Sequence, residues 1–211
     1  MLLNQLLSNN SYIYNGKNDE LDLSGEKICS LVGEDLFFNM KALKSLNLSF
    51  NSLKSWSSYQ FNTLNELESL NMSFNRIEEL NDTNLFAGLK SVYDLDFSMN
   101  LISYLDNDIF INLKSLHVLT LTSNIIETIN EYALRGLTGL ITLFLNKNSL
   151  SYLEANTFND LINLEFLFLD VNNLTNLSDA SLFNSLTNLI YLDVSFNSIQ
   201  RWVAFKKLHV Y

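Results

Sequence analysis

Leucines and other apolar residues recur along the chain in a short pattern that includes one polar amide. The segment Leu43–Leu53 reads LKSLNLSFNSL, with leucine at its first, fourth, sixth and eleventh positions and asparagine at its ninth. In the central LNL the apolar and polar residues alternate, which is the period of a half-buried β-strand. Leu46 and Leu48 are therefore predicted to face a core, and Asn47 to face solvent. The pattern indicates a short strand followed by a turn.

The same pattern returns six more times. The copies are LESLNMSFNRI from Leu67, VYDLDFSMNLI from Val92, LHVLTLTSNII from Leu116, LITLFLNKNSL from Leu140, LEFLFLDVNNL from Leu164 and LIYLDVSFNSI from Leu189, spaced by 24 or 25 residues. A degenerate copy, LDLSGEKI from Leu21, precedes them with Glu26 in place of the asparagine. A repeat of this length predicts a solenoid in which each copy is one coil that contacts only its neighbours.

The repeat also sets the expected organisation of the chain. We predict an irregular N-terminal segment over residues 1–20 and one repeat array over residues 21–211, with about eight repeats and an incomplete C-terminal end. The last segment, FKKLHVY from Phe205, restarts the pattern and stops at Tyr211, at the point where a ninth strand is expected to begin.

The repeated asparagine has a physical explanation in the turn that follows each strand. A turn inside a core leaves backbone N–H and C=O groups that no strand partner can bond. An amide side chain both donates and accepts hydrogen bonds. We therefore predict a buried ladder in which each amide bonds backbone groups of its own turn and of the next. Its members are Asn51, Asn75, Asn100, Asn124, Asn148, Asn172 and Asn197.

A second apolar pattern follows each asparagine and ends in an F-x-x-L step. This step reads FNTL at Phe61, FAGL at Phe86, FINL at Phe110 and FNDL at Phe158. Aromatic residues that recur once per coil indicate a core spine along the back of the coils rather than a cofactor site. The predicted spine comprises Phe37, Phe61, Phe86, Phe110, Leu134, Phe158 and Phe183.

Together these motifs resemble a known family. LxxLxLxxNxL at a period of about 20 to 29 residues is the signature of leucine-rich repeats, and the chain resembles that family from about Leu21 to Tyr211. The F-x-x-L step is similar to the typical 24-residue animal class, which includes Toll-like receptor ectodomains, chaoptin, connectin and Slit. The resemblance implies an α/β solenoid, a horseshoe with a parallel β-sheet on the concave face and loops, turns or short helices on the convex face.

The resemblance also implies a function without catalysis or a cofactor. It implies a recognition module that binds a protein or glycoconjugate through its concave face. Such a module would be part of an extracellular or cell-surface receptor or adhesion protein of innate-immune or developmental signalling. The parent protein would signal by dimerisation. The alternative is a cytoplasmic leucine-rich repeat scaffold that positions a partner for a separate enzyme. Extracellular members normally close their ends with disulfide caps, whereas this chain has one cysteine, Cys29, which we expect to be a half-buried thiol.

Composition and charge exclude two classes of partner. Of the 211 residues, 47% are hydrophobic and 17% are charged, which is enough apolar material for a core. The formal net charge of −10 repels phosphate backbones, so nucleic acid is not an expected partner. No apolar run reaches the roughly 18 to 20 residues of a bilayer-spanning helix, so we expect no membrane span in this segment.

Sequons for N-glycosylation fit an extracellular location, although a chain this rich in asparagine and serine would contain about as many by chance. They occur at Asn9, Asn47, Asn71, Asn81, Asn173 and Asn176.

The outward strand positions change character along the array, and this change locates the expected ligand site. Early repeats carry serine and asparagine there, whereas late repeats carry aromatic residues beside carboxylates. Large rigid rings bordered by charge favour a protein-binding hot spot, although the same rings could simply pack against one another across strands. The predicted ligand-binding residues on the concave face are Phe144, Phe166, Phe168, Asp170, Tyr191 and Asp193, and the expected ligand is a protein with a basic and partly apolar surface.

Residues suited to catalysis or metal binding are scattered. His117 and His209 lie far apart, with no cysteine in register, and neither belongs to a triad or a zinc set. Asp94 and Asp96 share one strand face, for which we favour a solvated acidic surface over a cation site. The sequence predicts no catalytic residue, no metal site and no cofactor.

Overall fold

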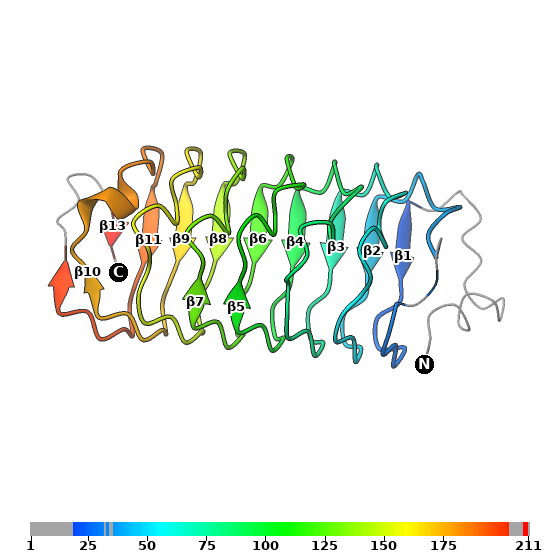
Figure 1. Cartoon of the computed structure of the whole chain (residues 1–211), viewed down its shortest axis with the longest axis horizontal. Helices are drawn as coiled ribbons and strands as arrows, with labels where there is room; N and C mark the ends of the chain where they lie inside the picture. The colour runs from blue at the N-terminus through cyan, green and yellow to red at the C-terminus, as the bar shows by residue number, and fades with distance from the viewer. Residues whose placement is uncertain (1–18, 32, 34–35, 203–208, 211) are drawn as a thin grey trace.

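A computed structural model describes residues 19–31, 33, 36–202 and 209–210 of the chain, and it shows a stack of coils that share one parallel sheet (Figure 1). The nine strands of this sheet run in the order β1-β2-β3-β4-β6-β8-β9-β11-β13. Their bounds are β1 Glu20–Asp22, β2 Ser45–Asn47, β3 Ser69–Asn71, β4 Asp94–Asp96, β6 Val118–Thr120, β8 Thr142–Phe144, β9 Phe166–Phe168, β11 Tyr191–Asp193 and β13 His209–Val210. The predicted parallel sheet is confirmed.

The repeat sets the register of the sheet. Equivalent positions of successive repeats lie opposite each other, as in the pairing of Leu46 with Leu70 and of Leu70 with Leu95. In the nine-stranded sheet, the middle residue of β2, β3, β4, β6, β8, β9 and β11 is a buried leucine, and its two neighbours are only partly buried. One face of the sheet therefore packs on the core and the other meets solvent; we call the second one the sheet face.

The back of the coils contains very little regular structure. Two pairs of short strands lie there, β5 Tyr104–Leu105 with β7 Thr128–Ile129 and β10 Asn176–Leu177 with β12 Arg201–Trp202. The described helical structure is one 3-10 helix, η1, at Ala180–Phe183. No helix in the described part of the chain is long and apolar enough to cross a membrane.

The aromatic spine is buried along the back of the coils. Phe61, Phe86, Phe110 and Phe158 are fully buried, and ring centroids of neighbours such as Phe86 and Phe110 are 5.7 Å apart. Leu134 is also buried, in the coil where leucine replaces phenylalanine. Coils approach closely here, because a Cβ added at Gly88 would lie 2.5 Å from the backbone of Asn62.

Each ladder asparagine bonds its own turn and the preceding coil. The Nδ2 of Asn75 donates to the carbonyls of Met72 and Leu48, and its Oδ1 accepts from the N–H of Leu53. Equivalent bonds recur from Asn51 to Asn197. We expected each amide to bond its own turn and the next coil. That expectation was wrong, because the bonds outside its own turn go to the preceding coil. Six of the amides are buried, and Asn197, near the end of the array, is half-buried.

The residue before each ladder asparagine, and before Glu26 at the equivalent place in the first coil, adopts a left-handed backbone conformation. We call this series the turn row; it comprises Gly25, Phe50, Phe74, Met99, Ser123, Lys147, Val171 and Phe196, with φ between 52° and 71°. The N–H of a turn-row residue donates to the next coil, as from Phe50 to the carbonyl of Ser73 at 3.1 Å and from Phe74 to Ser98 at 2.9 Å. A regular bond between coils therefore holds the unusual φ in place.

Three local expectations differ from the structure. Cys29 is exposed rather than half-buried, because it lies outside the apolar positions of the first coil. Ser49 and Ser73 follow the outward Asn47 and Asn71 by two residues, so strand alternation places them on the outward face too; they are only 4% exposed, because the chain turns toward the core directly after each strand. The end of the chain contributes a ninth strand, since His209 pairs with Tyr191.

Candidate binding surface on the sheet face

Four half-buried aromatic side chains lie on the late strands of the sheet face. Strand β8 carries Phe144, β9 carries Phe166 and Phe168, and β11 carries Tyr191. Parallel register places Phe144 opposite Phe168, and Phe166 opposite Tyr191. We call these four residues, together with Asp170 and Asp193, the aromatic patch. The fold thus brings together all six residues that the sequence predicted.

The rings of the aromatic patch contact one another across the strands. Phe144 and Phe168 are stacked, with centroids 4.6 Å apart and planes at 14°, and Phe168 and Tyr191 are 5.2 Å apart and tilted. Such contacts between rings on neighbouring strands stabilise a sheet. The rings remain only partly buried, so the same cluster offers an apolar surface to solvent.

The two carboxylates of the aromatic patch lie close enough to affect each other. Partial burial and then the Asp193 charge raise the pKa of Asp170, while hydrogen bonds and Lys147 act in the opposite direction. Asp193 accepts a hydrogen bond from the N–H of Ser195 at 2.9 Å. The carboxylates therefore repel each other beside apolar rings, where a cation from a partner would be favoured.

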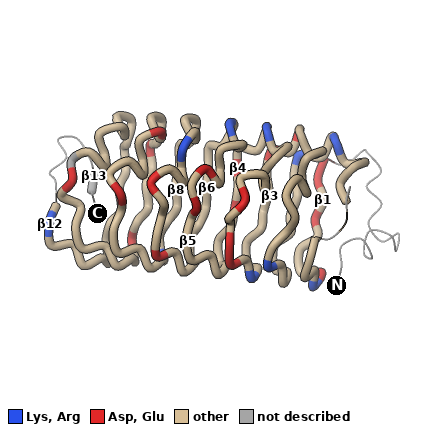
Figure 2. Tube along the Cα trace, viewed as in Figure 1, with Lys and Arg blue, Asp and Glu red and all other residues tan. Residues whose placement is uncertain are grey.

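The sheet face as a whole is acidic. Acidic residues occupy outward positions of β1, β4 and β11, whereas no described strand of the nine-stranded sheet carries lysine or arginine. Figure 2 shows acidic segments along β1 and β4. On β4, Asp94 has a raised pKa, mainly through burial and then through the neighbouring charge of Asp96. The surface suits a cationic partner and repels phosphates.

Replacing Asp94 by asparagine is expected to stabilise the fold at neutral pH and to have little effect in acid. A carboxyl whose pKa is higher in the folded state than its ordinary value of 3.8 holds its proton better when folded. Its contribution to stability is complete below that value and is lost as the pH rises through the folded-state pKa. Urea unfolding of Asp94→Asn and wild type at pH 7 and at about pH 3 measures the difference, with Glu66→Gln as an exposed control. A larger gain in acid than at pH 7 would contradict this.

The two histidines lie apart from one another, and no metal-ligating cluster gathers in the part of the chain that the structure describes. No group of three or more histidine, cysteine, aspartate or glutamate side chains in the described part of the chain could hold a metal ion. His117 is exposed, and its Nδ1 lies 2.6 Å from the carbonyl of Ser115. His209 lies on β13, at the end of the sheet.

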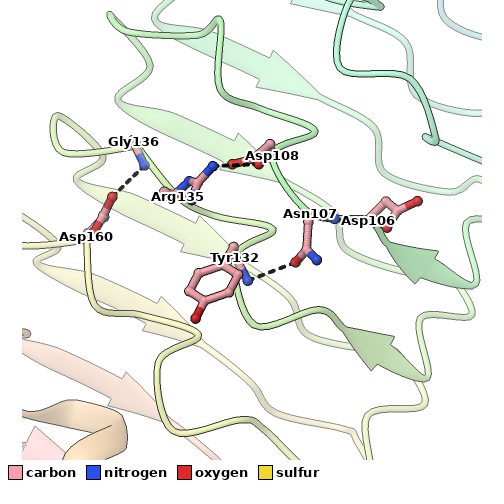
Figure 3. A network of polar contacts seen from close by, with 7 residues as sticks. All are labelled: Asp106, Asn107, Asp108, Tyr132, Arg135, Gly136 and Asp160. Atoms are coloured by element: carbon pink, nitrogen blue, oxygen red, sulfur yellow. Dashed lines mark hydrogen bonds and ion pairs between the residues drawn. The ribbon is translucent and has the colours of Figure 1, made fainter.

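A polar network on the back of the coils was not predicted from the sequence. Arg135 pairs with Asp108 at 2.6 Å, Asn107 accepts from the N–H of Tyr132 at 3.0 Å, and Asp160 accepts from the N–H of Gly136 at 2.7 Å (Figure 3). Each contact joins one coil to the next. A neighbouring hollow of about 120 Å³ is too small for most ligands. This network therefore connects coils.

The sequons differ in exposure. Asn81, Asn173 and Asn176 are exposed, and Asn47 and Asn71 are half-buried on the early strands of the sheet face. The oxygens of Asn47 and Asn71 accept hydrogen bonds from the N–H groups of Ser49 and Ser73, respectively. Asn9 lies outside the described residues.

Sequence reasoning missed one apolar surface. Phe50, Phe74 and Met99 of the turn row are 59%, 41% and 44% exposed. The only signal in the sequence was that the position before the ladder asparagine varies freely between apolar and polar residues.

Comparison with known proteins agrees with this architecture. A sequence profile described as leucine rich repeat matches residues 19–77 and 114–174. A search of curated proteins returns no significant match. Among solved structures, the TLR13–ssRNA13 complex is similar to this chain with a TM-score of 0.80 and 35% identity, over 85% of this chain and 25% of that chain.

Two further solved structures share the fold. A leucine-rich repeat protein of Leptospira interrogans has a TM-score of 0.75 and 26% identity, over 91% of this chain and 47% of that one. The glycosylated Drosophila Toll–Spatzle complex has a TM-score of 0.73 and 24% identity, over 90% of this chain and 30% of that one. This chain therefore spans between a quarter and about half of the length of these similar structures.

Proposed function

Because the chain belongs to the leucine-rich repeat family and its fold is similar to Toll-like receptors, we propose that it is a recognition module that binds a protein ligand through the aromatic patch. The observation that carries this proposal is the cluster of stacked, half-exposed rings beside two carboxylates. Outward positions of the early strands hold serine and asparagine in the same fold. The fold therefore does not require aromatic residues there.

The chemistry of the surface defines the expected ligand as basic and partly apolar. A lysine or arginine of the ligand would relieve the repulsion between Asp170 and Asp193, and its stem or an apolar neighbour would cover the rings. The solved complex of TLR13 contains single-stranded RNA, but the sheet face of this chain carries acidic side chains where an RNA ligand would need cations. A protein, or a glycoconjugate that carries a cation, is the better match.

The module is further proposed to act outside the cell, in a receptor or adhesion protein of innate-immune or developmental signalling that signals by dimerisation. The similar Toll structure is described as a molecular hub in development and innate immunity. The sequons at Asn81, Asn173 and Asn176 lie on exposed positions, where a glycan would meet solvent rather than core. No catalytic role is proposed.

Selection from a random peptide library displayed on phage tests this function. We expect the peptides that bind the wild-type chain to combine lysine or arginine with aromatic or aliphatic residues. Phe168→Ser and Phe166→Ala are each expected to weaken binding of the selected peptides by about 10-fold, since large central rings dominate such interfaces. Ser45 occupies the outward position of β2 that corresponds to Phe166 on β9, but it lies at the other end of the sheet. Ser45→Ala is therefore expected to leave the affinity unchanged. Equal affinities for all three variants, or selection of acidic peptides by this face, would refute the placement.

A further inference from the structure

A second apolar surface lies away from the aromatic patch, on the turn row of the early coils. Phe50 and Phe74 stack with ring centroids 4.2 Å apart and planes at 11°, and both rings remain substantially exposed. Met99 continues the surface in the next coil. Beside these side chains lies an open hollow of about 430 Å³, which is also lined by Arg76 and by the ladder residues Asn51, Asn75 and Asn100. This volume is within the range of ligand sites in proteins.

The fold does not require apolar residues at these positions. The equivalent positions of other coils hold residues of every kind with the same sign of φ, namely Gly25, Ser123, Lys147, Val171 and Phe196. A left-handed conformation is unfavourable for any residue with a Cβ, by about 1–2 kcal/mol. Phenylalanine and methionine therefore occupy turns that suit glycine or asparagine better, and they place their side chains in solvent. Stacking buries part of the Phe50 and Phe74 rings, and the large exposed remainder of the three side chains is available for contact with a partner.

The backbone beneath this surface is well supported. The N–H groups of Phe50, Phe74 and Met99 donate to carbonyls of the following coils at 2.9–3.1 Å. The next residue in the chain after Phe50, Phe74 or Met99 is a buried ladder amide. A surface held in this way loses little conformational freedom when a partner binds.

The charge beside the hollow defines the partner. Arg76 is exposed, and no ion pair involves it among the described residues, in a chain whose net charge is −10. We propose that Phe50, Phe74, Met99 and Arg76 form a second docking surface for an acidic peptide segment of a protein partner. An aromatic or branched side chain of that segment enters the hollow, and a neighbouring carboxylate pairs with the guanidinium of Arg76. The two surfaces thus select partners of opposite charge.

Methionine methyl groups provide a direct reporter of this surface. Met99 is 44% exposed and lines the hollow, whereas Met40 and Met72 are buried. The probes are two acetylated peptide amides, one with the sequence Glu-Leu-Phe-Asp and one with Gln-Leu-Phe-Asn. In the full chain labelled with ¹³C at methionine methyl groups, we expect both peptides to shift the Met99 resonance and to leave those of Met40 and Met72 in place. The acidic peptide is expected to bind about 2- to 5-fold more tightly, as an exposed ion pair allows.

Four variants separate this surface from the aromatic patch. Arg76→Gln is expected to remove the preference for the acidic peptide, whereas Arg201→Gln, which removes another exposed cation, should preserve it. Phe74→Asn suits the left-handed turn and keeps the fold, yet it should abolish the shift of Met99 by either peptide. Phe168→Ser should change nothing in this titration. An unmoved Met99 resonance in the wild type, an unchanged preference in Arg76→Gln, or a shift lost in Phe168→Ser would each overturn the proposal.

Discussion

Replacing Asn100 by leucine is expected to lower the free energy of unfolding by about 3 kcal/mol, because one buried N–H loses its partner and several carbonyls lose a donor. The N–H of Ile77 donates to Oδ1 of Asn100 at 3.0 Å, and Nδ2 of Asn100 donates to the carbonyls of Met72 and Phe97 at 3.0 Å. Those two carbonyls also accept from Asn75 and Asn124, respectively. The two carbonyls thus keep one donor each in the variant, whereas the buried N–H of Ile77 loses the hydrogen bond to Asn100.

Urea unfolding of three variants tests the ladder. Asn197→Leu removes the same kinds of bond at the half-buried end of the array, so we expect a smaller loss there. Asn100→Asp keeps the acceptor for Ile77 but turns a carboxylate oxygen toward carbonyls, and it should also destabilise the fold at neutral pH. If Asn100→Leu and Asn197→Leu lowered the free energy of unfolding by the same amount, burial of the bonded backbone groups would not explain the need for an amide.

Replacing Phe86 by alanine is expected to cost about 3–5 kcal/mol, the range for a large ring removed from a packed core. Phe86 is fully buried, and its ring centroid lies 5.7–6.0 Å from those of Trp56, Phe97 and Phe110. Trp56 comes from the preceding coil, and Phe97 and Phe110 come from the following coil. Since coils contact only their neighbours, the cavity weakens two interfaces of the array at once.

Equilibrium unfolding in urea, followed by tryptophan fluorescence, measures this loss. Trp56 lies beside the cavity and reports the local change, and far-ultraviolet circular dichroism reports the whole array. Phe196→Ala is the matched control, because its ring is 83% exposed and its removal should change the free energy of unfolding by no more than about 0.5 kcal/mol. A loss below about 1 kcal/mol for Phe86→Ala would contradict a packed spine.

The strands of the large sheet from β1 to β11, the core and the members of the aromatic patch could be read from the sequence, whereas the short strand pairs on the back of the coils could not. Leu46, Leu70 and Leu95 occupy the same place in successive repeats, so one register satisfies every coil. A slip by one residue would turn every leucine to solvent. The same argument placed Phe144 beside Phe168 before any distance was known, since neighbouring strands of a parallel sheet align equivalent positions.

The turn row and the direction of the ladder could not be read in this way. Phe50, Lys147 and Val171 share a positive φ but no chemical property, because a bond to the next coil imposes the conformation. The amides likewise could have bonded either neighbouring coil, and only the handedness and stagger of the stack select the preceding one. Whether an outward ring stays exposed also depends on side chains from the adjacent coils.

The sequence by itself determined the period of the solenoid, the inward and outward sides of each strand and the need for an amide at each turn. These features follow from local periodicity and from backbone hydrogen bonding, and they repeat in every coil. Only the tertiary structure decided the exposed row at the turns, the contacts between rings and the place of Arg76 beside the open hollow. These features arise between coils, where residues about 24 positions apart meet at distances that no single repeat specifies.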